Sequence, residues 1–341
     1  MAYVVRSTER VRGIGADYET KAMLYLMSCR DDSHEIFSFA IDFFNDVTGL
    51  NSFADKAWDV QSKGTKNASA KTIGRGMVTL FKNYMSELCF DYLILFLAGV
   101  PDSFCEDSSI TTFGIENIKP KALQSIKSGL KEEALNREYI DSAWVTDENI
   151  DSFLSHVSIV IDDKSKAEYI KRIININPKF IQNDDVLESI FIKIRNKQSE
   201  LKNEIVEGAI INNLEDVYSY NRTLKSKDIR LMALNSIVNR DVIKYGIPSF
   251  FIPIIKNQSS QSMKETVEDC QLRLATMLFD KSFTEEFWEL LDLICKSIEE
   301  KPELDTKGTY ELIKNETIVH NQRLDLLTVQ YLISVMKEAL Q

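Results

Sequence analysis

The chain has 341 residues, of which 44% are hydrophobic and 27% are charged, and its formal net charge is −11. This composition predicts a globular protein with room for one large domain or two smaller ones. The net negative charge argues against DNA binding by the chain as a whole, because Lys and Arg are needed to neutralise phosphates.

Cysteine, histidine and hydropathy narrow the class of protein further. The five cysteines are an odd number without CxxC spacing, which favours reduced thiols over a disulfide framework or a zinc site. Three histidines argue against a histidine-rich metal site. The longest apolar run, residues 92–100, is far shorter than the roughly 20 residues that cross a bilayer. With no signal-peptide pattern behind the charged N-terminus, we expect a cytoplasmic protein that does not bind membranes.

The first predicted helix has the sequence DYETKAMLYLMSCR. Asp17 can cap its N-terminus, and Ala22 and Leu26 belong to an apolar stripe with helical spacing. Glu19 falls in the first turn. An acid there is favoured by the positive end of the helix dipole, so this position alone does not make Glu19 a site residue.

The stretch 36–63 carries the main functional signal. Its first half, IFSFAIDFFNDVTG, alternates apolar and polar residues and predicts a strand that closes on Asp42 and Asp46, beside a turn at Gly49. Its second half, AWDVQSKG, predicts another strand. Because side chains alternate along a strand, Asp59 shares one face with the polar residues two and four positions later.

These two strands together predict a site for a divalent cation. Asp46 offers a hard carboxylate ligand, and Gln61 with the carbonyl of Ser62 could complete the inner shell. Lys63 could orient or deprotonate a water and stabilise developing negative charge, which is the chemistry of phosphodiester hydrolysis. Asp59 could equally be a salt-bridge partner of Lys63.

Asp42 interrupts the apolar run FSFAIDFF, where burying a carboxylate is costly. It is therefore paired, exposed on an edge, or part of a site. With Asp46 four residues later we favour the site, as a second ligand or as a support for Lys63. The alternative is that both residues are simple turn or edge acids.

The arrangement of Asp46 with Gln61-Ser62-Lys63 resembles the PD-(D/E)xK nuclease motif in its Gln-x-Lys form, as in Mrr-like restriction enzymes. More narrowly, the chain resembles the double-stranded-DNA endonuclease domain of bacterial anti-phage systems such as CBASS and Lamassu. The resemblance covers residues 11–100 and, more loosely, 184–248. Three ordered matches carry it: Gly15-x-x-Tyr18-Glu19, Asp42-x-x-x-Asp46, and Gln61-x-Lys63 before a helix start rich in Ser, Thr and Lys.

The resemblance implies a restriction-endonuclease-like α/β core over residues 1–115 and a mostly α-helical domain for regulation or oligomerisation over 116–341. It implies an endonuclease that uses Mg²⁺ or Mn²⁺, held by Asp46 and Gln61. Catalytic roles are implied for Lys63, Asp42 and Glu19 as well.

The resemblance also implies partners. The chain has no recognisable cyclic-oligonucleotide sensor, which is a departure from the CBASS members. Control is therefore expected from partner subunits, such as an SMC-like ATPase and an accessory protein of a Lamassu-type complex. A homo-oligomer is expected too, since one active site cuts one strand. The resemblance implies cleavage that is held off until infection is sensed.

A basic segment follows the predicted site. Residues 60–86 contain five Lys and Arg residues and no acid. Lys66, Lys71 and Arg75 are the predicted contacts to the DNA backbone, and the alternative is a solvated helix face. Neither GxxxxGK[ST] nor GxGxxG occurs in this segment, so ATP binding is not predicted.

The sequence CFDYLILFLAGV predicts a buried strand, and the rest of the chain predicts mostly helices. These predicted helices cover residues 120–135, 147–157, 164–175, 184–202, 227–245, 263–280, 283–300 and 322–340. Their apolar stripes indicate core or subunit interface. Two other functions stay open: a non-catalytic helical scaffold whose nuclease-like core is vestigial, and a nuclease that acts on RNA or single strands.

Overall fold

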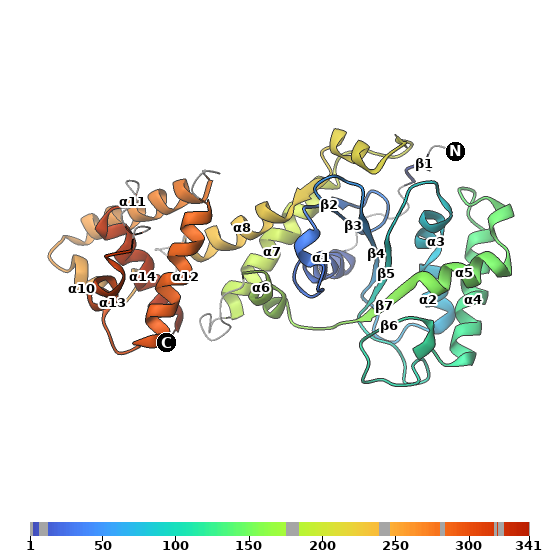
Figure 1. The fold of residues 1–341 in the computed structure, drawn as a ribbon, viewed down its shortest axis with the longest axis horizontal. Coiled ribbons are helices and arrows are strands. Elements are labelled where there is room, and N and C mark those ends of the chain that lie inside the picture. Colours follow the sequence, from blue (N-terminus) through green and yellow to red (C-terminus); the bar gives the residue numbers. More distant parts are fainter. Residues whose placement is uncertain are drawn as a thin grey trace. The chain divides into compact units, whose positions relative to one another are not determined.

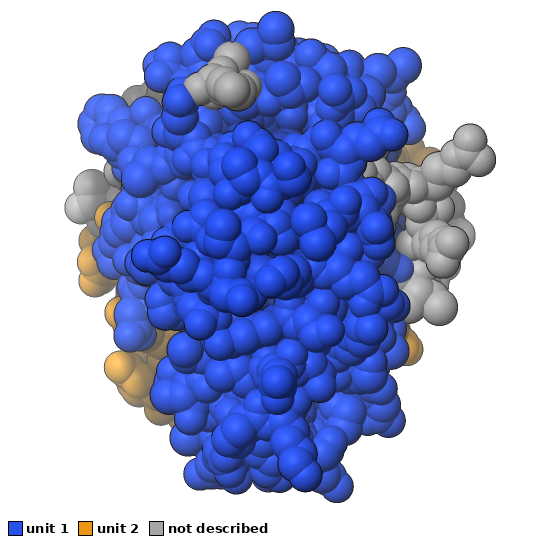
Figure 2. Space-filling model, turned by 90° about the vertical axis from the view of Figure 1, so that its right-hand side faces the viewer, with its two compact units in different colours: residues 1–173, 191–229 blue, residues 174–190, 230–341 orange. Residues whose placement is uncertain are grey.

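The structure, a computed structural model, describes residues 3–6, 13–174, 184–238, 246–279, 284–316, 319 and 324–340. It divides into two compact units, unit 1 (residues 1–173 and 191–229) and unit 2 (residues 174–190 and 230–341), which Figure 2 draws in different colours. The predicted domain boundary at residue 115 lies within unit 1. The predicted helix ends at residues 175, 245, 280, 283 and 322, and the start of the resemblance at residue 11, lie outside the described residues.

A mixed sheet forms the centre of unit 1 (Figure 1). Across the sheet, the described strands are β6 (Thr112–Phe113), β7 (Val157–Ile161), β5 (Tyr92–Leu97), β4 (Ala57–Lys63), β3 (Val47–Leu50), β2 (Ser38–Ile41) and β9 (Thr223–Lys225). Strands β4, β5 and β7 are parallel, and the other neighbours pair antiparallel. A separate pair joins β1 (Tyr3–Val4) to β8 (Ile210–Ile211). The predicted α/β class is therefore confirmed for this unit.

Three strands of the sheet, β6, β7 and β9, lie in stretches where the sequence predicts no strand. Helix α5 (Asp147–His156) ends one residue earlier than predicted, and β7 begins at the next residue and pairs with β5. Strand β9 directly precedes helix α8 (Ser226–Val238). The sheet thus extends into the part of the chain that was predicted to be mostly helical.

The single strand predicted at the start of the 36–63 stretch is two strands, β2 and β3, joined by a tight turn. Asp42 begins this turn with a left-handed φ of 48°, and its N–H donates to the carbonyl of Asp46 at 3.0 Å. The turn predicted at Gly49 is wrong, because Gly49 lies inside β3. A Cβ added there would come within 3.1 Å of Ile36 and 3.4 Å of Leu26, so this glycine allows close packing rather than a turn.

Helix α1 (Gly13–Ser28) packs against β3 and β4. Its fully buried side chains include Ala22, Met23, Leu24 and Leu26, so burial extends around the helix beyond the predicted stripe of Ala22 and Leu26. The helix starts earlier than predicted and ends at Ser28. This packing places the N-terminal half of α1 beside the end of β4, where the predicted site lies.

Helices α2 (Ala70–Gly76), α3 (Val78–Met85) and α4 (Pro120–Leu135) belong with α5 to a second layer. Side chains from these helices and from β5 share one hydrophobic core. Glycines let α2 and α4 cross closely, because a Cβ on Gly74 would lie 2.1 Å from the carbonyl oxygen of Ile126. A Cβ on Gly129 would likewise lie 2.1 Å from the carbonyl oxygen of Lys71.

Helices α6 (Lys166–Ile174) and α7 (Asp184–Leu201) follow in the chain, and both were predicted. Unit 2 contains α10 (Ile252–Ile255), α11 (Ser260–Phe279), α12 (Thr284–Glu300), α13 (Thr306–Ile313) and α14 (Leu326–Leu340). The predicted stripes of α12 and α14 are core: Phe287, Leu290, Ile294 and Tyr331 are all fully buried. Helix α14 packs against α11, α12 and α13.

Candidate active site

The turn between β2 and β3 delivers Asp46 to the end of β4. Strand β3 pairs with β4 so that Val47 lies opposite Val60, which places the preceding residue, Asp46, next to Gln61. Three donors converge on its Oδ2: Gln61 Nε2 at 2.8 Å, the Ser62 N–H at 2.7 Å and Ser62 Oγ at 2.7 Å. Asp46 and Gln61, two of the predicted site residues, are therefore in direct contact. The hydrogen bonds hold the Asp46 carboxylate in one orientation.

The electrostatics of Asp46 are set by its burial and by Lys63. Burial raises the pKa of Asp46, while the nearby charge of Lys63 and the hydrogen bonds from Ser62 lower it. Lys63 passes close to Gly76 of α2, since a Cβ added to that glycine would lie 3.1 Å from Lys63 Cε. Lys63 therefore lies against the end of α2, and its charge acts on Asp46.

Glu19 of α1 belongs to the same electrostatic cluster. Its partner is Lys202, the residue after α7, with which it forms an ion pair. Burial, followed by the charge of Asp46, raises the pKa of Glu19 to about 7, against the lowering effect of Lys202. Lys202 is not among the catalytic residues that the sequence predicted, and its side chain is only 8% exposed.

Asp42 is held by Arg222. Arg222 Nη1 donates to the Asp42 carbonyl oxygen at 2.6 Å and lies 3.3 Å from its carboxylate. The same guanidinium donates to the carbonyl oxygens of Lys202 and Glu204. Burial raises the pKa of Asp42, and the charges of Lys202 and Arg222 oppose this. Nothing local in the sequence marks Arg222, because its partner is 180 residues away.

Asp59 is fully buried behind the site and is bound by neutral donors. Its Oδ2 accepts from Asn45 Nδ2 at 2.6 Å and Asn83 Nδ2 at 2.7 Å, and its Oδ1 accepts from Thr48 Oγ1 at 2.7 Å. Burial raises the pKa of Asp59 to about 6. The predicted alternative, an ion pair with Lys63, is not among these contacts. Sequence reasoning missed Asn45, which looks like an ordinary turn residue.

A small cavity of about 90 Å³ opens over these groups. The cavity is lined by site residues and by three arginines: Asp42, Asn45, Asp46, Gln61 and Lys63 with Arg6, Arg75 and Arg137. Carboxylate and amide oxygens in the same lining as guanidinium groups suit a cation together with a phosphate. Arg6 and Arg137 are further site candidates that sequence reasoning missed.

The predicted DNA-backbone residues are each paired with an acid. Lys66 pairs with Asp163. Lys71 and Arg75 share Glu132 of α4, at 2.7 Å and 2.5 Å. The acids come from later parts of the chain, so the acid-free composition of residues 60–86 does not by itself give an unneutralised basic surface.

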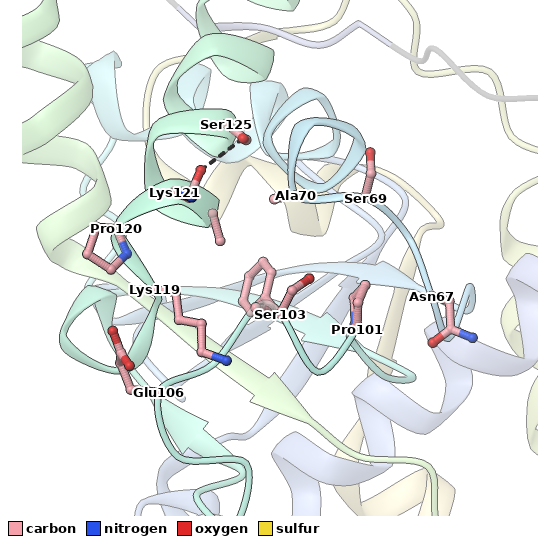
Figure 3. Close-up of a pocket in the computed structure, with 12 residues that line it drawn as sticks. Asn67, Ser69, Ala70, Pro101, Ser103, Glu106, Lys119, Pro120, Lys121 and Ser125 are labelled. Atoms are coloured by element: carbon pink, nitrogen blue, oxygen red, sulfur yellow. Dashed lines mark hydrogen bonds between the residues drawn. The ribbon is translucent and has the colours of Figure 1, made fainter.

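A larger cavity of about 810 Å³ lies elsewhere in unit 1, where the N-terminal ends of α2 and α4 meet (Figure 3). Ser69, Pro101, Ser103 and Lys119 are among the residues that line it. Lys119 Nζ donates to the carbonyl oxygen of Asp102 at 2.9 Å. None of the predicted catalytic residues lines this cavity, so its size does not make it the site of the predicted chemistry.

The donor set near Asp46 fits Mg²⁺ or Mn²⁺ of the kind that nucleases use. Within the described residues, no group of three or more His, Cys, Asp and Glu side chains is arranged to enclose a metal. Mg²⁺ commonly takes one or two carboxylates and completes its shell with waters and substrate phosphates. Asp46 would supply a carboxylate from the cavity lining, and Glu19, which interacts electrostatically with Asp46 but is not among the lining residues, would supply a second. The amide oxygen of Gln61 and the carbonyl of Ser62, whose N–H already points to Asp46, supply neutral oxygens on the same strand.

No protein-family model, no curated protein and no solved structure matches this chain. In the part of the chain that the structure describes, none of the helices combines the length and apolar character that a membrane span requires. The function therefore has to be argued from the chemistry of the site.

Proposed function

We propose that this chain is a metal-dependent endonuclease that hydrolyses phosphodiester bonds of double-stranded DNA. One observation carries the proposal: Asp46 is bound by Gln61 and Ser62 at the end of β4, directly before Lys63. The order of elements from α1 through β2, β3, β4, α2 and α3 to β5 supports a restriction-endonuclease-like core. In such a core, the acid and the Gln-x-Lys residues meet at the end of neighbouring strands.

In the proposed reaction, Asp46 and Gln61 hold the cation, with Glu19 as a further carboxylate. The bound metal supplies Lewis-acid stabilisation of the phosphate and lowers the pKa of a water. Lys63 orients or deprotonates the attacking water and stabilises the negative charge that develops on the phosphate. Asp42, fixed by Arg222, keeps the turn that presents Asp46 in place.

The arginines at the cavity support a phosphate substrate. Arg6, Arg75 and Arg137 provide planar donors that match phosphate oxygens. Each also pairs with an acid: Glu207 at 3.6 Å, Glu132 at 2.5 Å and Glu133 at 2.5 Å. DNA entering the site would exchange these acids for phosphates, with Lys66 and Lys71 following the backbone next to it.

The cellular role that we propose is that of an effector nuclease in bacterial anti-phage defence, held off until partner subunits release or assemble it. An SMC-like ATPase and an accessory protein are the proposed partners, and a homo-oligomer would supply the two sites that a double-strand break needs. The support is the resemblance of the three ordered motifs. Unit 2, a separate helical unit, is a reasonable place for such contacts.

The test is plasmid degradation by the purified full-length chain with Mg²⁺, with Mn²⁺ and with EDTA. We expect cutting that needs a metal and is lost in Asp46→Asn and Lys63→Ala. The matched control is Asp55→Asn, an exposed acid in the loop before β4, which should cut like the wild type.

A second arm separates the remaining alternatives. Competition with RNA and with single-stranded DNA identifies the preferred substrate. If the chain cuts under no condition, even with its neighbouring-gene partners added, the nuclease proposal is wrong and the scaffold function takes its place.

A further inference from the structure

We infer that Asn45 is a further cation-binding residue of this site, and that its side-chain oxygen accepts a divalent cation directly or through one of the cation's waters. The inference rests on the proposed function for the identity of the cation site. It adds a residue that lies one position before Asp46 and outside the Gln-x-Lys motif.

The first observation is an unpaired acceptor in a buried place. Asn45 is 6% exposed, and its Nδ2 donates to Asp59 Oδ2 at 2.6 Å. Its Oδ1 has no hydrogen-bond partner, although it is shielded from solvent. Leaving a buried carbonyl oxygen unpaired costs free energy, so such an atom calls for a ligand.

The second observation is where this residue lies. Asn45 lines the small cavity together with Asp46, Gln61 and Lys63. Its neighbours in the cavity therefore include the carboxylate and the amide proposed to hold the cation. An amide oxygen is an acceptor only, so the species that it binds is a cation or a hydrogen-bond donor.

The orientation of the amide follows from its partner. The Asp59 carboxylate accepts hydrogen bonds, so the Asn45 group that faces it at 2.6 Å is the NH₂. A reversed amide would place two oxygens against each other. Asp59 is fixed in turn by Thr48 and Asn83. This makes Asp59 a positioning residue that directs Asn45 Oδ1 away from itself.

A divalent cation is the ligand that the surroundings favour. Carboxylate and amide oxygens are the donors that Mg²⁺, Mn²⁺ and Ca²⁺ take in proteins. A neutral donor from the substrate would have to reach a buried oxygen beside Asp46, where a cation is attracted more strongly.

The test measures Mn²⁺ binding by isothermal titration calorimetry on the uncut, full-length chain, without DNA. Asn45→Ala should weaken Mn²⁺ binding at least fivefold, and Asp46→Asn should abolish it. The matched control is Asn83→Ala, which also removes one donor from Asp59 Oδ2 and further loses the hydrogen bond from Tyr3. Because Asn83 does not line the cavity, Asn83→Ala should bind Mn²⁺ within twofold of the wild type.

The outcomes separate the two proposals. Equal weakening in Asn45→Ala and Asn83→Ala, or no weakening in Asn45→Ala, would overturn the inference, as would a wild type that binds no Mn²⁺. Weaker Mn²⁺ binding in Asn45→Ala, but not in Asn83→Ala, supports the role of Asn45. If that result is obtained and no preparation cuts DNA, the nuclease proposal fails but the cation site remains. If Asn45→Ala does not fold, Asn45→Ser serves in its place with the same expectations.

Discussion

Lys202, the residue after α7, forms an ion pair with Glu19 of α1, and both side chains are largely withdrawn from solvent at 8% and 14% exposure. The two residues are 183 positions apart in the chain. Lys202 also acts electrostatically on Asp42 and Asp46. A cation from the later part of unit 1 therefore favours the charged forms of Glu19, Asp42 and Asp46, against the effect of their burial.

The pKa of Glu19 predicts a pH-dependent cation affinity. This pKa is raised to about 7 by burial and by Asp46, so Glu19 is mostly protonated at pH 6 and mostly ionised at pH 8. Because the cation displaces the proton, we expect Mn²⁺ affinity to rise roughly tenfold across this range. Titration calorimetry at several pH values should show the rise in the wild type and a nearly flat profile in Glu19→Gln. The exposed Glu265→Gln is the control, and an equal rise in Glu19→Gln would exclude Glu19.

Replacing Lys202 should move the pH dependence of Mn²⁺ affinity to higher pH. Without its cationic partner, Glu19 keeps the raising effects of burial and of Asp46, so its pKa rises further. We expect Lys202→Met to shift the midpoint of the Mn²⁺ affinity curve upward by about 1 pH unit. Lys256→Met, an exposed lysine of unit 2, controls for the loss of one positive charge. A downward shift would show that Lys202 does not act through Glu19.

Glu132 should weaken DNA binding, because it forms ion pairs with two side chains that are predicted to contact the DNA backbone. It accepts from both Lys71 and Arg75, which are exposed, so each ion pair contributes little to stability. Glu132→Gln should therefore tighten binding to a DNA duplex by roughly 2–10-fold. Fluorescence anisotropy in EDTA measures binding without cleavage. Glu138→Gln removes the same charge from an exposed position nearby, and equal tightening in both variants would point to net charge instead.

The crossing of α2 and α4 should not tolerate a side chain at Gly129. An added Cβ would meet backbone at 2.1 Å, so the helices would have to separate. We expect Gly129→Ala to lower the free energy of unfolding by about 1–3 kcal/mol. The midpoint of thermal unfolding should fall by about 2–10 °C. Ser128→Ala, on the exposed side of the same helix, should melt like the wild type; an unchanged Gly129→Ala would mean that the crossing is loose.

Local patterns in the sequence predicted the elements that carry strong periodicity. The long helices of both units and the strands β4 and β5 follow from such patterns. Asp46 and Gln61 were placed together correctly in space, because their strands are neighbours in the chain. Their roles in binding a metal stay predictions.

What the sequence did not predict depends on contacts across long separations. Strand β7 has only five residues, and although its sequence VSIVI is rich in β-branched residues, it directly follows a helix without a turn signal; it pairs with β5. Lys202 and Arg222 enter the site from residues that were assigned to a helical domain. Glu132 neutralises a segment that is free of acids in sequence. Asn45 is recognisable only when Asp59 and the cavity are seen together.

The pairing of β1 with β8 and of β2 with β9 has a consequence for how the protein is made. Tyr3 pairs with Ile211, and Phe39 pairs with Leu224, so two early strands find their partners only when the ribosome has translated more than two hundred residues. Until then, β2 presents an unpaired edge, and Glu19 and Asp42 lack the cations that hold them. The nascent chain therefore cannot complete this acidic site early in synthesis. The site can form only after the whole of unit 1 has been synthesised. A fragment that stops at residue 115 would contain the sequence motif but would not form the site.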